Sequence, residues 1–135
     1  SDGSDWNVGI QDPNGKDGEV LGGIKVKSGT SISTSGDYEK TFTDKKTGKR
    51  YFHILDSKTG YSVKTDIRSC TIICNSGLNA DGLSTACFSL GVKKSQKLLK
   101  EYNAKAVFVD KNNKVYVSDG VEFTLTAKDY KILNL

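Results

Sequence analysis

Residues 69–91 read SCTIICNSGLNADGLSTACFSLG and contain the sharpest change of secondary-structure pattern in the sequence. The run over residues 69–75 is short, small and apolar, which is typical of a buried β-strand. Over residues 79–90 the apolar side chains recur at spacings of three and four, which predicts an amphipathic helix. Gly91 is a suitable residue to end that helix. This stretch therefore predicts a strand followed by a helix packed on a sheet.

The regions on either side complete the pattern. Residues 94–102 predict a second helix, and residues 121–135 predict one further strand. The other expected strands cover residues 6–11, 20–26, 30–34, 40–43, 49–54, 104–109 and 114–117, with polar turns between them. Among these turns are a basic hairpin tip at 44–48 and polar turns at 35–37 and 56–60. We therefore expect an α+β fold, a mostly antiparallel sheet with two helices inserted late in the chain.

Composition narrows the class of protein. The 135 residues are enough for a single domain with its own core, and a formal charge of +4 with dispersed lysines does not indicate a nucleic-acid partner. No apolar run approaches the roughly 20 residues that span a bilayer. The chain begins at Ser1 and contains no methionine, so we expect it to be part of a longer protein, with residues 1–5 as a linker.

The three cysteines do not indicate a disulfide framework, because their number is odd. Cys70 and Cys74 lie an even number of residues apart in the expected strand, so both face the same side. We expect them to be small core residues rather than zinc ligands. The chain has only one histidine, which excludes a site built from several histidines.

Asp81 and Thr85 are four residues apart and therefore share one face of the expected helix. A carboxylate and a hydroxyl are hard oxygen ligands, which suit Mg²⁺ when water and phosphate oxygens complete its coordination. The same pair also occurs in helices without a ligand, because the helix dipole favours Asp in the first turn. Gly82 destabilises a helix by about 0.5–1 kcal/mol relative to Ala, which predicts that something packs closely against the backbone there.

The stretch HILDSKTGY, residues 53–61, brings the only histidine from a strand into a polar turn. Imidazole can bind a phosphate or transfer a proton, and Thr59 and Gly60 can offer backbone N–H groups to an anion. A half-buried histidine without a ligand fits the same pattern. The stretch STSGDYE, residues 33–39, fits either a backbone that approaches a ligand or an ordinary turn.

The order of these three stretches along the chain resembles the C-terminal half of the ApbE family, which comprises FAD:protein FMN transferases. The segments STSGDYE, HILDSKTGY and ADGLSTACFSLG carry the resemblance. WNVGIQDP at residues 6–13 and AVFVDK at residues 106–111 are also similar to the family. The resemblance thus extends from residue 6 to about residue 120.

The resemblance implies roles for individual residues. Asp81 and Thr85 match the family's Mg²⁺ ligands, and Ser84 is expected to contribute through its backbone. Ile54 matches a position that contacts FAD, and His53 lies beside the phosphates that are cleaved, as a general base or a phosphate ligand.

A further implied group is the segment Ser35, Gly36 and Asp37, which matches a loop near the FAD pocket. With Thr59, it completes the expected flavin-binding set. The implied reaction cleaves the FAD pyrophosphate, esterifies FMN to a Thr or Ser hydroxyl of an acceptor flavoprotein and releases AMP.

The sequence departs from the family in two ways. Ser57 and Ser62 replace common prolines, and Gly82 replaces a common Ala. The N-terminal half of the family, which holds most of the adenine pocket, is not in these residues. We therefore expect the N-terminal half of the same enzyme to be a partner and the isolated chain to have little or no activity. By resemblance, the full-length protein is expected to be extracytoplasmic and lipid-anchored.

Three other functions fit parts of the pattern. The chain can be a module that binds or scavenges FAD without transferring FMN. The product distinguishes this function from transfer: a transferase yields an FMN-modified acceptor protein, whereas a scavenging module leaves FAD unchanged. It can also be a purely structural partner domain, which the presence of Asp81, Thr85 and His53 disfavours. A generic α+β domain would require three ordered matches to have arisen by chance.

Overall fold

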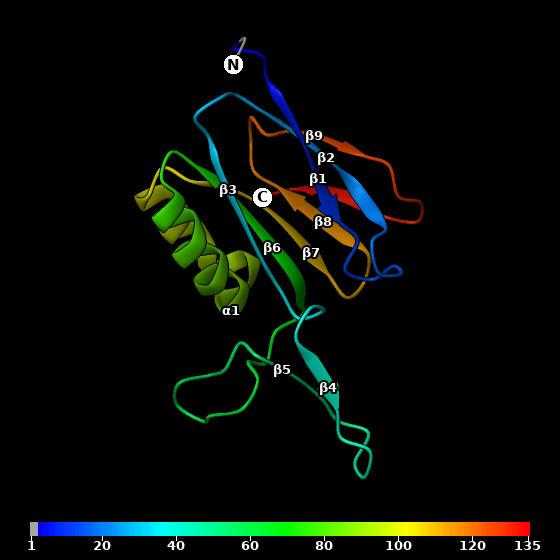
Figure 1. Cartoon of the computed structure of the whole chain (residues 1–135). Helices are drawn as coiled ribbons and strands as arrows, with labels where there is room; N and C mark the ends of the chain where they lie inside the picture. Colours follow the sequence, from blue (N-terminus) through cyan, green and yellow to red (C-terminus); the bar gives the residue numbers. More distant parts are fainter. Residues whose placement is uncertain (1–2) are drawn as a thin grey trace.

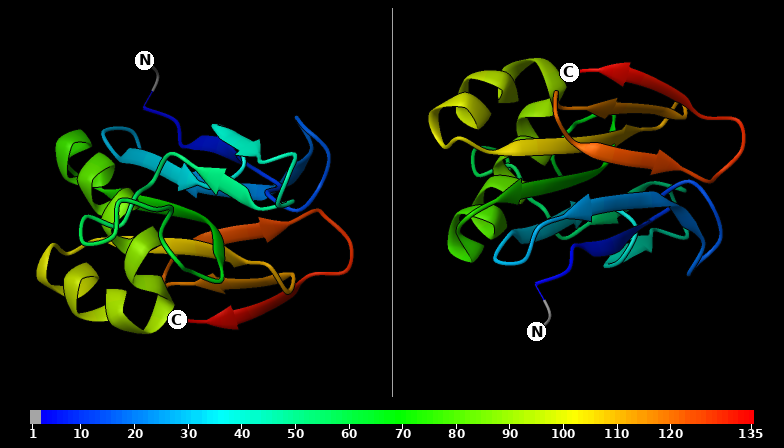
Figure 2. Two further views of the ribbon diagram at one scale, coloured as in Figure 1. Left: turned by 90° about the horizontal axis from the view of Figure 1, so that it is seen from below. Right: turned by 90° about the horizontal axis from the view of Figure 1, so that it is seen from above.

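A five-stranded sheet forms the middle layer of the computed structural model, which describes residues 3–135 (Figure 1). Its strand order is β10-β8-β7-β6-β3. Helix α1 (Gly77–Glu101) covers one face of this sheet, and a three-stranded sheet of order β1-β2-β9 covers the other (Figure 2). The strands are β1 (Trp6–Gln11), β2 (Val20–Val26), β3 (Ser31–Gly36), β4 (Thr41–Thr43), β5 (Arg50–Phe52), β6 (Ile67–Cys74), β7 (Lys105–Asp110), β8 (Lys114–Val117), β9 (Glu122–Leu125) and β10 (Lys131–Asn134).

Strand β6 is buried on both faces, which explains its continuous apolar sequence. Cys70, Ile72 and Cys74 pack in the core on the helix side, whereas Ile73 packs in the core between the two sheets. The predicted strand is therefore confirmed, as is the placement of Cys70 and Cys74 on one face. These two and Cys87 are buried and unbridged.

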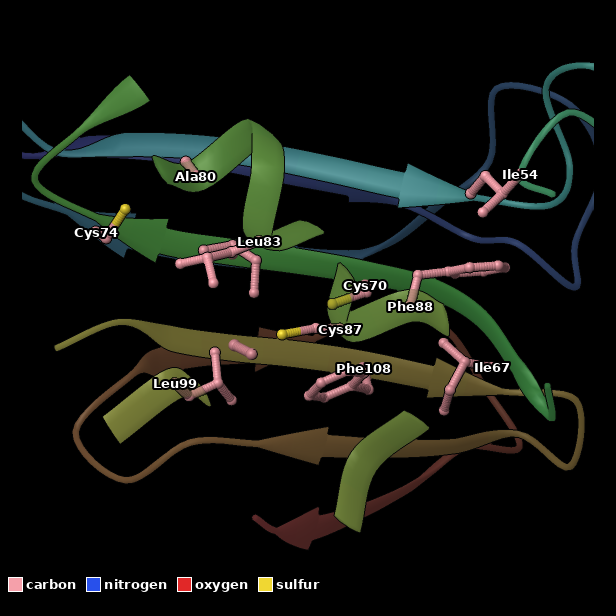
Figure 3. Packing of buried hydrophobic residues seen from close by; sticks show 12 residues of the cluster. Ile54, Ile67, Cys70, Cys74, Ala80, Leu83, Cys87, Phe88, Leu99 and Phe108 are labelled. Atoms are coloured by element: carbon pink, nitrogen blue, oxygen red, sulfur yellow. The ribbon is translucent and has the colours of Figure 1, made fainter. Parts of the chain in front are cut away.

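Helix α1 packs its apolar side chains on β6 and β7, and Figure 3 shows these contacts from close by. The side chains that it contributes to the core are Ala80, Leu83, Cys87, Phe88 and Leu99. The two predicted helices form one continuous element rather than two, and its two helical segments meet at Gly91, the residue expected to end the first helix. The element bends at Gly91, where φ is 75° and ψ is 172°. A glycine accepts this left-handed conformation without a Cβ clash, which allows α1 to change direction.

Two further expectations need correction. The tail contains two strands, β9 and β10, rather than one, and β10 runs parallel to β8 within an otherwise antiparallel arrangement. Their alternating, half-exposed pattern leaves only a weak apolar signal. Ser35 and Gly36 belong to β3 and pair with Cys70 and Ser69, so they are not part of a turn.

Strands β4 and β5 form a separate hairpin that projects from the layers (Figure 1). It is attached to the body through Phe52, whose ring packs edge-on against Phe88 with 5.9 Å between centroids. At the other end of the chain, Asp5 forms an ion pair with Lys25. Within residues 3–135, no helix has the length and apolar character needed to cross a membrane.

The turn after β1 is fixed by Asp12, whose Oδ1 accepts hydrogen bonds from Asn14 N at 2.9 Å and Gly15 N at 3.1 Å. The Tyr130 hydroxyl also donates to Asp12. Burial and this contact raise the pKa of Tyr130. The turn at residues 12–15 therefore also anchors the C-terminal segment.

Candidate functional site

The first turns of α1 lie against strand β3, and this junction is rich in hydroxyl groups. Ser76 caps the helix by accepting a hydrogen bond from Asn79 N at 3.3 Å. Ser33 and Ser35 are two residues apart on β3, so both face the helix. The cap and the strand together fix which helical side chains meet β3.

A chain of hydrogen bonds joins these side chains. The Ser35 Oγ lies 2.7 Å from Ser84 Oγ and 3.1 Å from Thr85 Oγ1. The Ser33 Oγ donates to Asp81 Oδ1 at 3.3 Å. The structure therefore brings together the predicted metal residues Asp81, Ser84 and Thr85, and adds the two serines of β3. We call these five residues the hydroxyl cluster.

The direction of each hydrogen bond in the hydroxyl cluster follows from its carbonyl partner. Ser84 Oγ donates its only proton to Asp81 O at 2.8 Å, so Ser35 must donate to Ser84. Thr85 must then donate to Ser35, because a hydroxyl has a single proton. Each hydroxyl proton is thereby committed, and what the cluster still offers is the capacity to accept.

The acceptors that face solvent belong to Asp81 and Thr85. Asp81 and Thr85 are exposed, Ser84 is buried, and the two serines of β3 are half-buried. Asp81 forms no ion pair within residues 3–135. A carboxylate surrounded by oxygen lone pairs is the donor set that suits a hard divalent cation such as Mg²⁺. The described residues contain no group of three or more His, Cys, Asp or Glu side chains suited to a metal, so the fit rests on one carboxylate and hydroxyls.

Gly82 does not have the close neighbour that its sequence predicts. A Cβ built there would meet nothing within 4 Å, and the residue is exposed beside Asp81. The expectation of tight packing was wrong, because the glycine lies in an early turn of the helix on its open side.

Asp37 is buried and already neutralised from within the chain. Its Oδ1 accepts a hydrogen bond from Arg68 Nε at 2.7 Å, and Arg50 lies 3.5 Å from Oδ2 while donating to the Asp37 carbonyl at 2.7 Å. Gly36 is required next to it because a Cβ would lie 2.3 Å from the Tyr38 ring. Burial, with the charges of Glu39 and Asp37, raises the pKa of Tyr38. These residues thus fix the end of β3.

His53 and Ile54 follow β5 and face opposite environments. Ile54 is buried in the helix-side core (Figure 3), and its carbonyl accepts a hydrogen bond from Val63 N at 3.0 Å. His53 is exposed and lines a groove of about 480 Å³. Within residues 3–135, no hydrogen bond or ion pair joins His53 to the hydroxyl cluster.

Thr59 lies in the turn after His53, but the turn does not offer free backbone donors. The N–H groups of Thr59 and Gly60 both donate to Asp56 O. Thr59 instead lines a second groove, of about 560 Å³, together with Ser89 of α1. The Ser89 hydroxyl donates to Thr85 O at 2.9 Å, so this groove adjoins the helix face that carries the hydroxyl cluster.

The fold and the hydroxyl cluster together define a layered α+β domain with a candidate site for a divalent cation. Comparison with known proteins gives the family. The ApbE family profile matches residues 1–108, and the chain belongs to this family.

Individual relatives and structures agree with this assignment. The chain is 40% identical to a FAD:protein FMN transferase of Treponema pallidum, over 87% of this chain and 32% of the relative. It is 34% identical to one of Klebsiella pneumoniae, over 84% of this chain and 35% of the relative. The chain therefore spans about a third of the length of these curated relatives.

Among solved structures, the ApbE protein of Thermotoga maritima superposes with a TM-score of 0.70 and 37% identity, covering 85% of this chain and 36% of that one. The flavinyl transferase ApbE of Pseudomonas stutzeri, in its apo form, superposes with a TM-score of 0.59 and 32% identity, covering 93% and 36%. The α+β fold expected from the sequence is thus that of the family.

Proposed function

We propose that this chain supplies the Mg²⁺ site and part of the FAD-binding surface of a FAD:protein FMN transferase. The hydroxyl cluster carries the proposal, because all its hydroxyl protons are committed and its remaining capacity is to accept. A site of this kind favours a cation over an anion or an apolar group. Membership of the ApbE family supports the choice of reaction.

In this proposal Asp81 and Thr85 hold the ion through their side chains, and Ser84 contributes through its backbone. Bound Mg²⁺ would neutralise pyrophosphate charge and stabilise the charge that grows on the AMP leaving group. Ser33 and Ser35 position the two ligands from β3, through their hydrogen bonds to Asp81 and Thr85.

The reaction is a phosphoryl transfer between two oxygen atoms. The hydroxyl oxygen of an acceptor Thr or Ser forms a bond to the phosphorus of the FMN portion, and the bond from that phosphorus to the AMP oxygen breaks. The hydroxyl proton must be removed, and exposed His53 is the side chain to which we assign this step or the binding of a phosphate oxygen. Thr59, beside the groove that reaches Ser89, adds to the surface offered to FAD. The buried Ile54 side chain supports this region from the helix-side core.

The rest of the enzyme is a necessary partner in this proposal. The chain covers about a third of its relatives, so we assign most of the adenine pocket to the residues outside it. We expect the isolated 135 residues to show little or no transfer. Full turnover by the isolated chain would contradict this division of the site. The proposal includes an extracytoplasmic, lipid-anchored location, which fractionation and protease accessibility of intact cells test.

The direct test uses the full-length enzyme with FAD, Mg²⁺ and a candidate acceptor flavoprotein. Mass spectrometry of the acceptor should show addition of FMN, and AMP should appear in equal amount. Chelation of the metal should stop both. Bound but unchanged FAD would instead identify a scavenging module, and absence of FAD binding would identify a structural domain.

A further inference from the structure

Basic residues occur throughout the chain, but its net positive charge falls in one segment. Residues 40–64 contain seven of the 20 basic residues and two of the 16 acidic ones, giving this segment +5 and the rest of the chain −1. Both acidic residues are engaged in their own turns: Asp44 accepts from Lys46 N and Thr47 Oγ1, each at 2.8 Å, and Asp56 accepts from Lys58 N at 2.8 Å. We call residues 40–64 the basic arm.

The basic arm also exposes large apolar side chains. Phe42, Leu55 and Tyr61 are 65%, 58% and 61% exposed, and all three line the groove of about 480 Å³ that contains His53. Phe42 stacks on Tyr51 with 5.2 Å between ring centroids. A contiguous cluster of exposed apolar side chains is typical of an interaction site, whereas apolar side chains exposed singly are not.

These exposed side chains are not what attaches the arm to the body. A two-stranded hairpin is marginally stable by itself, and inward-facing side chains supply its attachment. Phe52 packs against Phe88, and Ile54 is buried in the helix-side core. The outer apolar groups contact their neighbours within the arm, as Phe42 does Tyr51 and Tyr61 does Lys49, but they are not part of the helix-side core.

We propose that the basic arm docks the acceptor protein, through an extended acidic segment with an apolar side chain that enters the groove. The inference rests on the proposed function. Charge complementarity selects an acidic partner, and the concave groove fits single side chains rather than a membrane surface. Because His53 lines the same groove, a segment seated there carries its Thr or Ser hydroxyl to the residue assigned to the proton.

The test measures binding of labelled peptides to the full-length enzyme by fluorescence anisotropy. One peptide carries a Thr, a Leu and several Asp residues, and the other carries Asn in place of each Asp. The Asp peptide should bind at least about tenfold more tightly, and the difference should shrink as salt is added. Lys45→Glu with Lys46→Glu should remove the preference.

Two further variants sharpen the result. Lys93→Glu with Lys94→Glu, a matched exposed pair on α1, should keep the preference. Phe42→Ser should weaken both peptides alike. The proposal would be overturned if the two peptides bound equally or if neither bound. It would also be overturned if both lysine-pair variants lost the preference for the Asp peptide to the same extent.

Two alternative occupants give separate results. Binding to phosphatidylglycerol vesicles that depends on Lys45 and Lys46, without a peptide preference, would reassign the arm to a membrane. Protection of the arm from hydrogen exchange in the full-length enzyme, but not in the isolated 135 residues, would show that the rest of the enzyme covers it. If the full-length enzyme binds the Asp peptide preferentially but transfers no FMN, the proposed function is refuted and the docking surface is supported.

Discussion

Two carboxylates lie beside strand β3, and their partners differ. Asp37, just after the strand, is buried and bound by the guanidinium groups of Arg68 and Arg50. Asp81, on α1, is exposed, and its side-chain hydrogen bond comes from Ser33. The first charge is neutralised by the protein itself, so its role is structural. The second is surrounded by committed hydroxyls, which leaves it available to a cation.

Asp81→Ala should give the largest effect. In the full-length enzyme we expect FMN transfer to fall by at least about 10³-fold, because a metal at such a site supplies several kcal/mol of charge stabilisation. Stability should change little, since the side chain is exposed. Transfer is measured by AMP release, with Asp119→Ala, an exposed aspartate in another turn, as the control. A rate like that of the unmodified enzyme would remove Asp81 from the site.

Asp37→Ala should instead act on folding. It leaves two guanidinium groups without their carboxylate, and we expect the free energy of unfolding to fall by about 3 kcal/mol. Urea denaturation of the full-length enzyme measures this change. A double-mutant cycle with Arg68→Ala should show that the two losses are not additive. Additive losses would mean that the ion pair does not stabilise the fold.

Ser35→Ala tests the hydroxyl cluster from the strand side. Loss of the bond to Thr85 should weaken Mg²⁺ binding by about tenfold and lower stability by about 1 kcal/mol. Titration calorimetry of the full-length enzyme with Mg²⁺ measures the affinity. Thr34→Ala is the matched control, because Thr34 bonds to Thr71 and not to the cluster. Equal affinity in both variants would place Ser35 outside the metal site.

Tyr130→Phe should give the smallest effect, about 1 kcal/mol of stability. The pKa of Tyr130 is raised in the folded state, so its contribution is fully present below the ordinary value of about 10 and is lost as the pH rises through the folded value. The free energy of unfolding of the variant should therefore fall less steeply with rising alkaline pH than that of the unmodified enzyme. Denaturation at a series of alkaline pH values measures this, and an unchanged slope would contradict the assignment.

The sequence was informative where the signal is local. The strand over 69–75 and the helix from 79 were predictable because their apolar periodicities are strong, and the spacing of Asp81 and Thr85 placed both on one face. Ser33 lies in the candidate stretch STSGDYE, but no role was predicted for it, because its contact with Asp81 joins residues 48 apart. The pairing of Asp37 with Arg68, 31 residues apart, depends on the register of β3 with β6, which no local pattern encodes.

The most direct measurement of the central claim is anomalous diffraction from crystals of the full-length enzyme grown with Mn²⁺ and FAD. Mn²⁺ is a hard cation that replaces Mg²⁺ and gives its own anomalous signal. We expect one peak within about 2.3 Å of a carboxylate oxygen of Asp81 and of Thr85 Oγ1. A peak bound elsewhere, with the Asp81 carboxylate free of metal, would contradict the account.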